Sequence, residues 1–413
     1  MKKNKLLENT IMLYILIFSN YFFNFVTIPY QTRVLGPEIY GRIGFALAFA
    51  TYFKLFFDFG FILSATEEIS KNRDNIKKIS KILNSVNCLK AIFIIIGLII
   101  MIIVTVFISP FKNNKLLFML YFAYVAIDAF QPDFLYRGTE NMKIITLRNV
   151  LIKMFFTFMI IVFLKTKSQY LLVPIFTICG SLFSLIAIYI NVRKKMKIKF
   201  QKVSWNDIRD AFNSSKIYFL SRIATTIYGA TNTFILGLIY PTGNTLGYYT
   251  SSEKILVAGR SAVSPISDSV YPYMVKNKDF KLIKKLLIYL MPIITIGCII
   301  CFIYAKDICI FAFGKEYAGS AIVLRYMIPL IFMTLPSYLL GFPTMSPLGL
   351  KKEANLTVIY GSIYQVIGIL ILFCIKSLNL NTICILTIST ELLILILRIC
   401  FIMKVKRKLI TNN

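Results

Sequence analysis

A lysine and an aspartate lie inside an apolar run of the sequence. Lys54 and Asp58 belong to the stretch 38–58, in which most other side chains are apolar or aromatic. A charged side chain costs about 2.5–3.5 kcal/mol on scales of helix insertion, and it usually faces the bundle interior or a water-filled cavity. Residues four apart share one helical face. The pair therefore predicts either an ion pair or part of a site for a charged ligand.

A second stretch repeats this layout in the other half of the chain. Gly247 and Arg260 have the same thirteen-residue spacing as Gly41 and Lys54. We expect the two stretches to form symmetry-related helices with a cation at the same depth in each half. A local pair with Asp58 gives no reason for that repetition.

Further polar side chains occur at helical spacing in other apolar runs, and we expect one central cavity to gather them. Arg and Lys suit phosphate oxygens, while amides and hydroxyls suit sugar hydroxyls and tyrosine rings can stack on sugars. This chemistry suits the head of a diphosphate-linked lipid sugar. The candidate substrate-binding residues are Lys54, Arg222, Lys254, Arg260, Arg325, Asn20 and Asn24; the candidates for charge balance or ion coupling are Asp58, Asp128, Glu253 and Asp268.

The alternative is that these charges are internal salt bridges that hold helices together. The spacing allows pairs of Lys54 with Asp58, of Arg260 with Glu253 or Asp268, and of Glu391 with Arg398. Three other cations could extend toward the membrane surface; these are Lys90, Arg148 and Lys153.

Composition identifies the elements that carry these groups. The chain has 413 residues, of which 57% are hydrophobic, and it contains 36 Phe and 24 Tyr. Such a chain is a polytopic membrane protein. It has no His, the commonest general base and metal ligand. The eight Cys lie almost entirely in apolar runs, so we interpret them as reduced filler and expect no metal site and no cofactor.

Twelve segments are long and apolar enough to span a membrane. They predict an all-α membrane protein with two six-helix lobes, at 1–192 and 216–403, a cytoplasmic linker at 193–215 and a basic tail at 404–413. The predicted spans are 10–30, 40–64, 83–108, 115–136, 144–164, 170–191, 216–240, 246–274, 286–305, 319–347, 357–376 and 381–403.

The formal net charge of +29 follows a pattern along the chain. Alternate loops counted from the N-terminus hold 29 of the 47 cations, whereas the other loops hold 9. Cytoplasmic loops carry the excess of Lys and Arg, so we place both termini in the cytoplasm. Six spans per half make the repeat parallel, related by a pseudo-two-fold axis along the membrane normal.

Two local signals concern the linker and the fourth span of each half. Ser204 and Asp207 form a plausible capping box, which predicts a short amphipathic interfacial helix; a disordered basic linker is the alternative. Pro132 and Pro336 each interrupt the fourth span of their half.

Several stretches of the chain form recognisable motifs: Arg33-Val-Leu-Gly-Pro-Glu-Ile-Tyr-Gly41, the segment 131–143, Phe219-Leu-Ser-Arg222 with the segment 231–237, Gly247-Tyr-Tyr-Thr-Ser-Ser-Glu-Lys254 and Phe313-Gly-Lys-Glu-Tyr317. Through these motifs the chain resembles, over nearly its whole length, the Wzx-type O-antigen and polysaccharide flippases of the multidrug/oligosaccharidyl-lipid/polysaccharide exporter superfamily. It departs from the family form at Pro132, where an aromatic residue usually follows Gln131.

The resemblance implies two six-helix lobes in a V shape around a cationic central cavity. It also implies transport, not catalysis: undecaprenyl-diphosphate-linked oligosaccharide would cross from the cytoplasmic to the outer leaflet of the bacterial inner membrane by alternating access. H+ or Na+ could couple to this movement. The expected partners are this lipid-linked sugar, the bilayer and other polysaccharide-assembly membrane proteins, and no nucleic acid.

Two other functions are compatible with parts of the sequence. A drug/cation antiporter of the same fold should keep an acidic cavity, whereas the mid-span charges here lean cationic. A membrane polymerase or ligase of surface polysaccharide should carry catalytic groups on a large external loop, but the predicted outside loops are short and His is absent.

Overall fold

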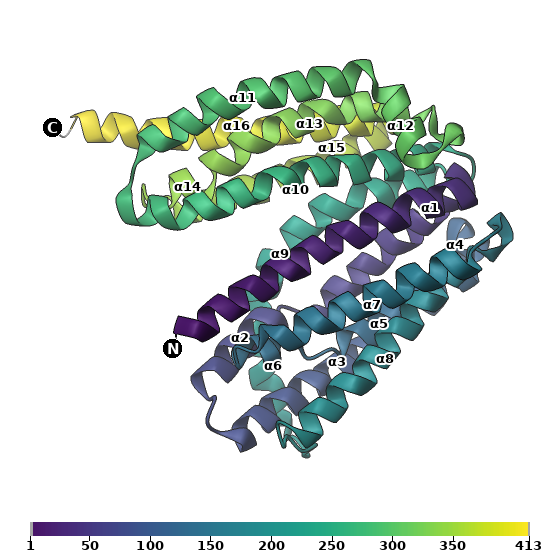
Figure 1. Cartoon of the computed structure of the whole chain (residues 1–413), viewed down its shortest axis with the longest axis vertical. Coiled ribbons are helices and arrows are strands. Elements are labelled where there is room, and N and C mark those ends of the chain that lie inside the picture. Colours follow the sequence, from purple (N-terminus) through teal and green to yellow (C-terminus); the bar gives the residue numbers. More distant parts are fainter. Residues whose placement is uncertain (1–2, 412–413) are drawn as a thin grey trace. The chain divides into compact units, whose positions relative to one another are not determined.

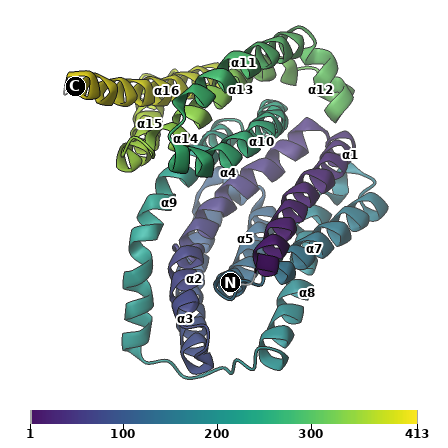
Figure 2. The ribbon, with the colours of Figure 1, turned by 60° about the vertical axis from the view of Figure 1, so that its left-hand side comes forward.

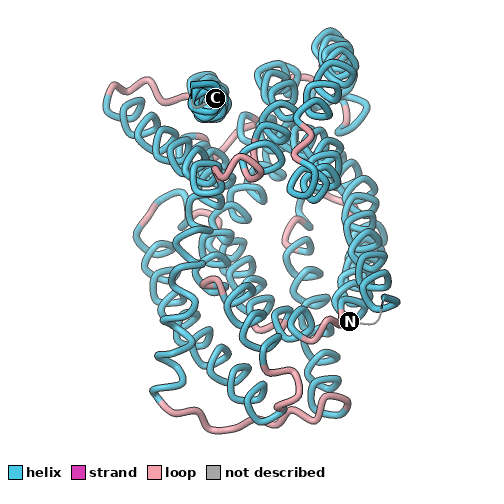
Figure 3. The backbone as a smooth tube through the Cα atoms, turned by 90° about the vertical axis from the view of Figure 1, so that its left-hand side faces the viewer, coloured by secondary structure: helices cyan, strands magenta, loops and turns pink. Residues whose placement is uncertain are grey.

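A computed structural model describes the backbone of residues 3–411, and the side chains of 3–7, 10, 220–221, 224–228 and 406–411 are outside its description. Throughout this described range the regular elements are helices (Figure 3). The all-α fold predicted from the sequence is therefore confirmed.

The chain divides into two compact units. The N-terminal unit comprises Met1–Leu35 and Ile43–Thr226, and the C-terminal unit comprises Gly36–Arg42 and Ile227–Asn413. The chain passes from one unit to the other after Leu35, after Arg42 and, inside the helix Trp205–Ile239, after Thr226.

The N-terminal unit contains α1 except for Gly36–Arg42, the helices α2 to α8 and the first part of α9 (Figure 1). The bounds are α1 Lys3–Asp58, α2 Phe61–Lys71, α3 Ile76–Phe107, α4 Ser109–Lys112, α5 Lys115–Ala129, α6 Asp133–Gly138, α7 Met142–Phe163, α8 Leu172–Lys194 and α9 Trp205–Ile239.

The C-terminal unit contains the rest of α9 and the helices α10 to α16. In this unit α13 packs against α10, α11 and α16, and α16 packs against α15 (Figure 1). The bounds are α10 Thr245–Asn277, α11 Phe280–Ile303, α12 Ala305–Phe313, α13 Ser320–Leu340, α14 Phe342–Met345, α15 Lys351–Cys374 and α16 Leu380–Thr411.

Every predicted span is mostly helical, although the spans 40–64, 115–136 and 319–347 each include a break between two helices. By length and composition, eight helical segments of the described chain could cross a membrane. Outside these eight, α9 contributes the shorter apolar helix Gly229–Ile239, and α5 has only 15 residues. The count of twelve spans and the symmetry of two lobes stay predictions.

The first two predicted spans are joined differently from the prediction. Gly36 has φ 70° and ψ 169°, so it forms a sharp kink between two helical segments of α1, with no separate loop between them. This left-handed φ favours glycine, which has no Cβ. The second predicted span is interrupted instead at Phe59 and Gly60, directly after Asp58.

A stripe of phenylalanine side chains packs α1 against α5 in the N-terminal unit. Phe45, Phe49, Phe53 and Phe57 recur every four residues and so share one face of α1. Ring centroids lie 5.2 Å apart between Phe45 and Phe118, and equally between Phe53 and Phe122, on α5. Such buried ring pairs stabilise by about 0.5–1.5 kcal/mol beyond the area they bury. They fix the register of α1 on α5.

Only one of the two prolines interrupts its helix. Pro132 separates α5 from α6, as predicted. The prediction for Pro336 was wrong, because α13 continues to Leu340 and ends at Gly341.

The predicted capping box at the start of α9 is confirmed. The backbone N–H of Asp207 donates to Ser204 Oγ at 3.3 Å, and the N–H of Ser204 donates to Asp207 Oδ2 at 3.0 Å. The prediction of a short separate helix was wrong, since α9 continues without a break to Ile239. Phe212 stacks on Phe59 in the N-terminal unit, which holds this first part of α9 in place.

Within the C-terminal unit, the two glycines of the sequence repeat cross each other. A Cβ on Gly41 would lie 2.6 Å from the backbone N of Gly247, and a Cβ on Gly247 would overlap the carbonyl of Pro37. The backbones of 36–42 and of the first turn of α10 can approach this closely only because both positions lack side chains.

We expect Gly247→Ala to lower the free energy of unfolding by at least about 1–3 kcal/mol, the usual cost of overpacking a core. The clash involves backbone atoms, which cannot move as a flexible side chain can. Thermal unfolding in detergent measures the effect. Gly297→Ala on α11 is the matched control, because no atom lies within 4 Å of the added methyl; an equal loss in both variants would contradict the close crossing.

Candidate functional site

Lys54 of α1 forms an ion pair with Asp128 of α5. Lys54 Nζ lies 2.7 Å from Asp128 Oδ2. The two side chains remain 44% and 24% accessible. Lys54 follows Phe53 of the phenylalanine stripe, so the packing of α1 on α5 brings the two charges together. The lysine is held, yet part of its surface stays open.

A second lysine lies beneath the break between α5 and α6. Lys90 of α3 is 3% exposed, and its Nζ donates to the carbonyl of Ala129 at 2.5 Å. Its charge also lies over the ring of Phe134 at 5.2 Å. Pro132 lacks an N–H and interrupts the helix ladder here. Lys90 therefore satisfies a carbonyl at the end of α5 and fills the break with positive charge.

Three acidic side chains surround these cations. Asp133 at the start of α6 pairs with Arg148 of α7. Asp58, the last residue of α1, interacts electrostatically with Lys90, Lys54 and Arg222. We call the seven residues the N-terminal charge cluster: Lys54, Asp58, Lys90, Asp128, Asp133, Arg148 and Arg222.

The N-terminal charge cluster has four cations and three acids when all are ionised. The formal charges of the cluster therefore sum to +1. Additional anionic groups would be stabilised here, since charge-assisted hydrogen bonds from Lys and Arg are roughly twice as strong as neutral ones. The cluster can therefore hold its own acids and still attract an anion.

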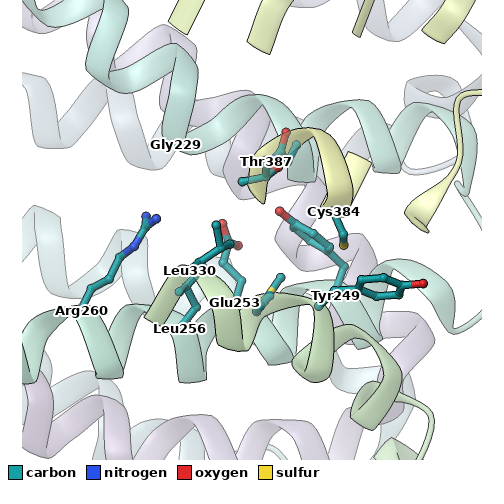
Figure 4. A pocket seen from close by; sticks show the side chains of 11 residues that line it. Gly229, Tyr249, Glu253, Leu256, Arg260, Leu330, Cys384 and Thr387 are labelled. Atoms are coloured by element: carbon teal, nitrogen blue, oxygen red, sulfur yellow. Dashed lines mark hydrogen bonds between the residues drawn. The ribbon is translucent and has the colours of Figure 1, made fainter. Parts of the chain in front are cut away.

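The C-terminal unit holds the second repeated cation. Arg260 of α10 forms a salt bridge with Glu391 of α16. About two turns before it on α10, Glu253 accepts a hydrogen bond from Thr233 of α9 at 3.1 Å. Figure 4 shows Tyr249, Glu253 and Arg260 along α10, with Cys384 and Thr387 of α16 facing them.

These groups line a pocket of about 40 Å³ inside the C-terminal unit. A cavity needs roughly 10–15 Å³ for one water molecule. The pocket therefore has room for a few waters or a small cation and is too small for a sugar ring. Its wall consists of Gly229, Asn232, Tyr249, Glu253, Leu256, Arg260, Tyr326, Met327, Leu330, Cys384 and Thr387.

A buried hydrogen-bond network adjoins this pocket. Asn232 Nδ2 donates to Thr387 Oγ1 at 2.8 Å, and Gln365 Nε2 donates to Asn232 Oδ1 at 2.9 Å. Thr390 Oγ1 donates to Gln365 Oε1 at 2.6 Å. Amides and hydroxyls of three helices thus satisfy one another, which fixes α9, α15 and α16 around the pocket.

The ion pairs differ from those that spacing along one helix allowed. Lys54 pairs with Asp128 and not with Asp58, and Arg260 pairs with Glu391 and not with Glu253 or Asp268. Arg398 donates to the carbonyl and the hydroxyl of Ser337 instead of pairing with Glu391. The specific pairs expected within one helix therefore do not form. Salt bridges that hold neighbouring helices together, as that alternative proposed, are present with other partners.

Five predicted site residues lie outside the charge cluster and the pocket lining. Asn20 is half-buried on α1, and Asn24 is exposed, with its Oδ1 3.5 Å from Lys153 Nζ. Asp268 is exposed on α10. Arg325 is exposed on α13, where its Nε donates to the Phe302 carbonyl at 3.2 Å. Lys254 is half-buried beside Glu253 and interacts with its charge.

Sequence reasoning missed the role of Lys90. We interpreted it as a residue that extends toward the membrane surface, yet it is among the most buried cations of the described chain. One signal could have found it: Lys90 lies deep in a helix whose following residues are almost all apolar, far from a polar end. Arg148 was misinterpreted in the same way, since Asp133 holds it inside the unit.

The Lys54–Asp128 pair gives a measurable coupling energy. We expect Lys54→Met and Asp128→Asn each to lower the free energy of unfolding by about 1–3 kcal/mol, because each leaves a charge without its partner. The double variant should lose less than the sum. Unfolding of all three variants in detergent measures the coupling.

The exposed pair of Lys71 and Glu67 on α2 is the control for that cycle. Its side chains are 68% and 51% accessible, and such surface pairs contribute about 0.2–1 kcal/mol. The inner pair would not be coupled if the losses in free energy of unfolding for Lys54→Met and Asp128→Asn were additive. The losses would then also be as small as those for Lys71→Met and Glu67→Gln.

Known proteins resemble this chain along most of its length. One curated relative is the "Putative O-antigen transporter" of Escherichia coli K12, which is 29% identical over 85% of this chain and 86% of that protein. A protein of the same name from Shigella dysenteriae is 26% identical over 87% of this chain and 91% of its own length.

Solved structures resemble its fold. The lipid II flippase MurJ in an inward closed conformation has a TM-score of 0.69 and covers 96% of this chain and 87% of its own. An inward-facing multidrug resistance MATE family transporter of the MOP superfamily has a TM-score of 0.62, covering 93% and 96%. Both are 13% identical, so the likeness concerns the fold alone, which is that of these transporters.

Residues 6–278 match the family described as polysaccharide biosynthesis protein. This match covers well over half of the chain and confirms the family expected from the sequence motifs. The chain is a multi-pass membrane protein that belongs to the polysaccharide biosynthesis protein family.

Proposed function

We propose that this protein is a flippase that moves undecaprenyl-diphosphate-linked oligosaccharide repeat units across the bacterial inner membrane. Movement runs from the cytoplasmic to the outer leaflet by alternating access and serves O-antigen or another surface polysaccharide. The family and the transporter names of both curated relatives support transport, and they favour it over an enzymatic activity. Both termini lie in the cytoplasm in this proposal.

The observation that carries the proposal is the accessible Lys54 within a charge cluster of net positive formal charge. A diphosphate brings negative charge that must leave water to cross the bilayer. Lys54 is both paired with Asp128 and 44% accessible, so phosphate oxygens can approach it without first uncovering it. When phosphate takes the lysine, Asp128 still lies within a cluster that contains Lys90, Arg148 and Arg222.

The direction of transport also suits the charge of the substrate. Moving one negative charge out of a negative cytoplasm gains about 2.3 kcal/mol per 100 mV of membrane potential. A diphosphate therefore gains free energy in the outward direction. This gain in free energy favours export. Export driven by the membrane potential does not need a separate coupling ion in every transport cycle.

We assign substrate binding to the cations and amides selected from the sequence: Lys54, Arg222, Lys254, Arg260, Arg325, Asn20 and Asn24. Lys54 and Arg222 have the strongest support, because they belong to the N-terminal charge cluster. Lys90 would act as a positioning residue that holds the end of α5, on which Asp128 lies.

The paired variants of Lys54 separate binding from stability. We expect Lys54→Met with Asp128→Asn to insert and fold, because both charges are removed together, but to lose at least about tenfold in transport rate, since phosphate loses its cation. The measurement is transfer of a defined lipid-linked oligosaccharide between leaflets of proteoliposomes.

The double variant Lys71→Met with Glu67→Gln is the matched control and should transport at the normal rate. Normal transport by the Lys54 and Asp128 double variant would sink the assignment of Lys54 to phosphate. If the protein transported a drug cation and did not transport the lipid-linked sugar, the antiporter alternative would be favoured.

We further propose that Glu253 takes up the coupling ion, H+ or Na+. Its carboxylate lines the small pocket, whose volume suits water or a cation. Thr233, Asn232 and Thr387 supply oxygen atoms nearby. Asp58, Asp128 and Asp268 remain candidates for charge balance.

Glu253→Gln tests this coupling while keeping the hydrogen bond from Thr233. In proteoliposomes we expect the variant to flip the lipid-linked sugar without a gradient but to lose acceleration by a pH or sodium gradient, because the amide carries no charge. The same readout on Asp307→Asn, an exposed acid of α12 in the same unit, is the control. Full gradient dependence in Glu253→Gln would contradict the assignment.

A further inference from the structure

The connection between α8 and α9 has an extreme local charge. Residues 193–202 contain six cations and no acid, and all six are exposed: Arg193, Lys194, Lys195, Lys197, Lys199 and Lys202. In the described part of the chain, none of the six forms a salt bridge. The next acid, Asp207, already pairs with Lys81 at 2.7 Å. We call residues 193–205 the basic connection (Figure 2).

The basic connection is held against α3 in a defined conformation. The carbonyl of Lys199 accepts hydrogen bonds from Ser80 Oγ and, at 3.2 Å, from Asn84 Nδ2. Ile198 is 4% exposed, and its N–H donates to the carbonyl of Val192. The exposed lysine side chains therefore extend from an anchored backbone.

Two spanning helices place the basic connection at the membrane boundary. It begins where the apolar segment that includes α8 ends, at Lys194. Ser80 and Asn84 lie in the first turns of α3, another segment that could cross the membrane from Ile76. Both helices therefore put this backbone at the level where an apolar span meets water.

Two aromatic side chains lie exposed on the same segment. Trp205 is 71% exposed and Phe200 is 67% exposed, and the ring of Phe200 stacks on Tyr189 with centroids 5.9 Å apart. Tryptophan is enriched at the membrane interface, where its ring is partly apolar and its N–H can stay hydrated. Clusters of Lys and Arg next to a span attract anionic lipids.

We propose that the basic connection is a binding surface for the headgroups of anionic phospholipids, with Trp205 and Phe200 inserted at the interface. The lysine and arginine side chains contact lipid phosphates, and the aromatic rings enter the boundary between headgroups and acyl chains. An acidic protein partner would explain the cations, but it would leave two aromatic rings at membrane level without a reason.

The chain carries its own reporter for this proposal, because Trp205 is its single tryptophan. The purified full chain in nanodiscs should show quenching of tryptophan fluorescence by brominated lipids. At the same mole fraction, brominated phosphatidylglycerol should quench roughly twofold or more strongly than brominated phosphatidylcholine, because the cations enrich anionic lipid around Trp205.

The triple variant Lys197→Gln, Lys199→Gln and Lys202→Gln should abolish the preference for phosphatidylglycerol while quenching by phosphatidylcholine persists. The matched control replaces three exposed cations of α11, Lys281, Lys284 and Lys285, by Gln and should keep the preference.

Three results would overturn the proposal. The first is Trp205 emission typical of a tryptophan in water, without quenching by either lipid. The others are equal quenching by the two brominated lipids and a preference for phosphatidylglycerol that persists in the triple variant. The experiment measures lipid contact and not transport. The lipid-binding proposal can therefore fail while the proposed flippase activity holds, and the flippase proposal can fail while lipid binding holds.

Discussion

An ionised side chain in an apolar helix must find a partner on a neighbouring helix, and this constraint sets much of the structure. A lone charge inside a bilayer costs several kcal/mol, and pairing recovers part of that cost. Lys54 and Asp128 meet this need between α1 and α5, and Arg260 and Glu391 meet it between α10 and α16. Each pair also fixes the alignment of two helices. The charged side chains, whose insertion into lipid costs free energy, thus help to specify how the helices of each unit pack.

The sequence predicted the helices well because hydropathy and capping are local properties. The apolar runs coincide with helices, and the box of Ser204 and Asp207 begins α9 as predicted. Ion-pair partners were not predictable in this way. Spacing of four residues reveals which charges share a face of one helix, but it carries no information about the rotation of a neighbouring helix. That rotation is set by contacts such as the phenylalanine stripe of α1 on α5. Lys90 was misinterpreted for the same reason, since Ala129 becomes its partner only after α5 has packed on α3.

The repeat in the sequence carries different chemistry in the two units. The N-terminal unit surrounds its repeated lysine with a cluster whose formal charges sum to a positive value. In the C-terminal unit, Arg260 forms a salt bridge with Glu391 and lines a small pocket together with Glu253. One unit is thus suited to an anion, and the other encloses a small polar pocket. A repeat that conserves the position of a cation can still diverge in what that cation serves, because its neighbours determine the local net charge.

The short segment 36–42 makes the two units inseparable as pieces of chain. It belongs to the C-terminal unit, although the residues on both sides of it belong to the N-terminal unit. The backbone therefore passes between the units three times, after Leu35, after Arg42 and after Thr226. A gene fragment encoding 227–413 would lack the seven residues whose backbone packs on Gly247, and it would leave the first turn of α10 uncovered. Although the sequence reads as two successive halves, the C-terminal unit is complete only when the first half of the chain supplies part of it.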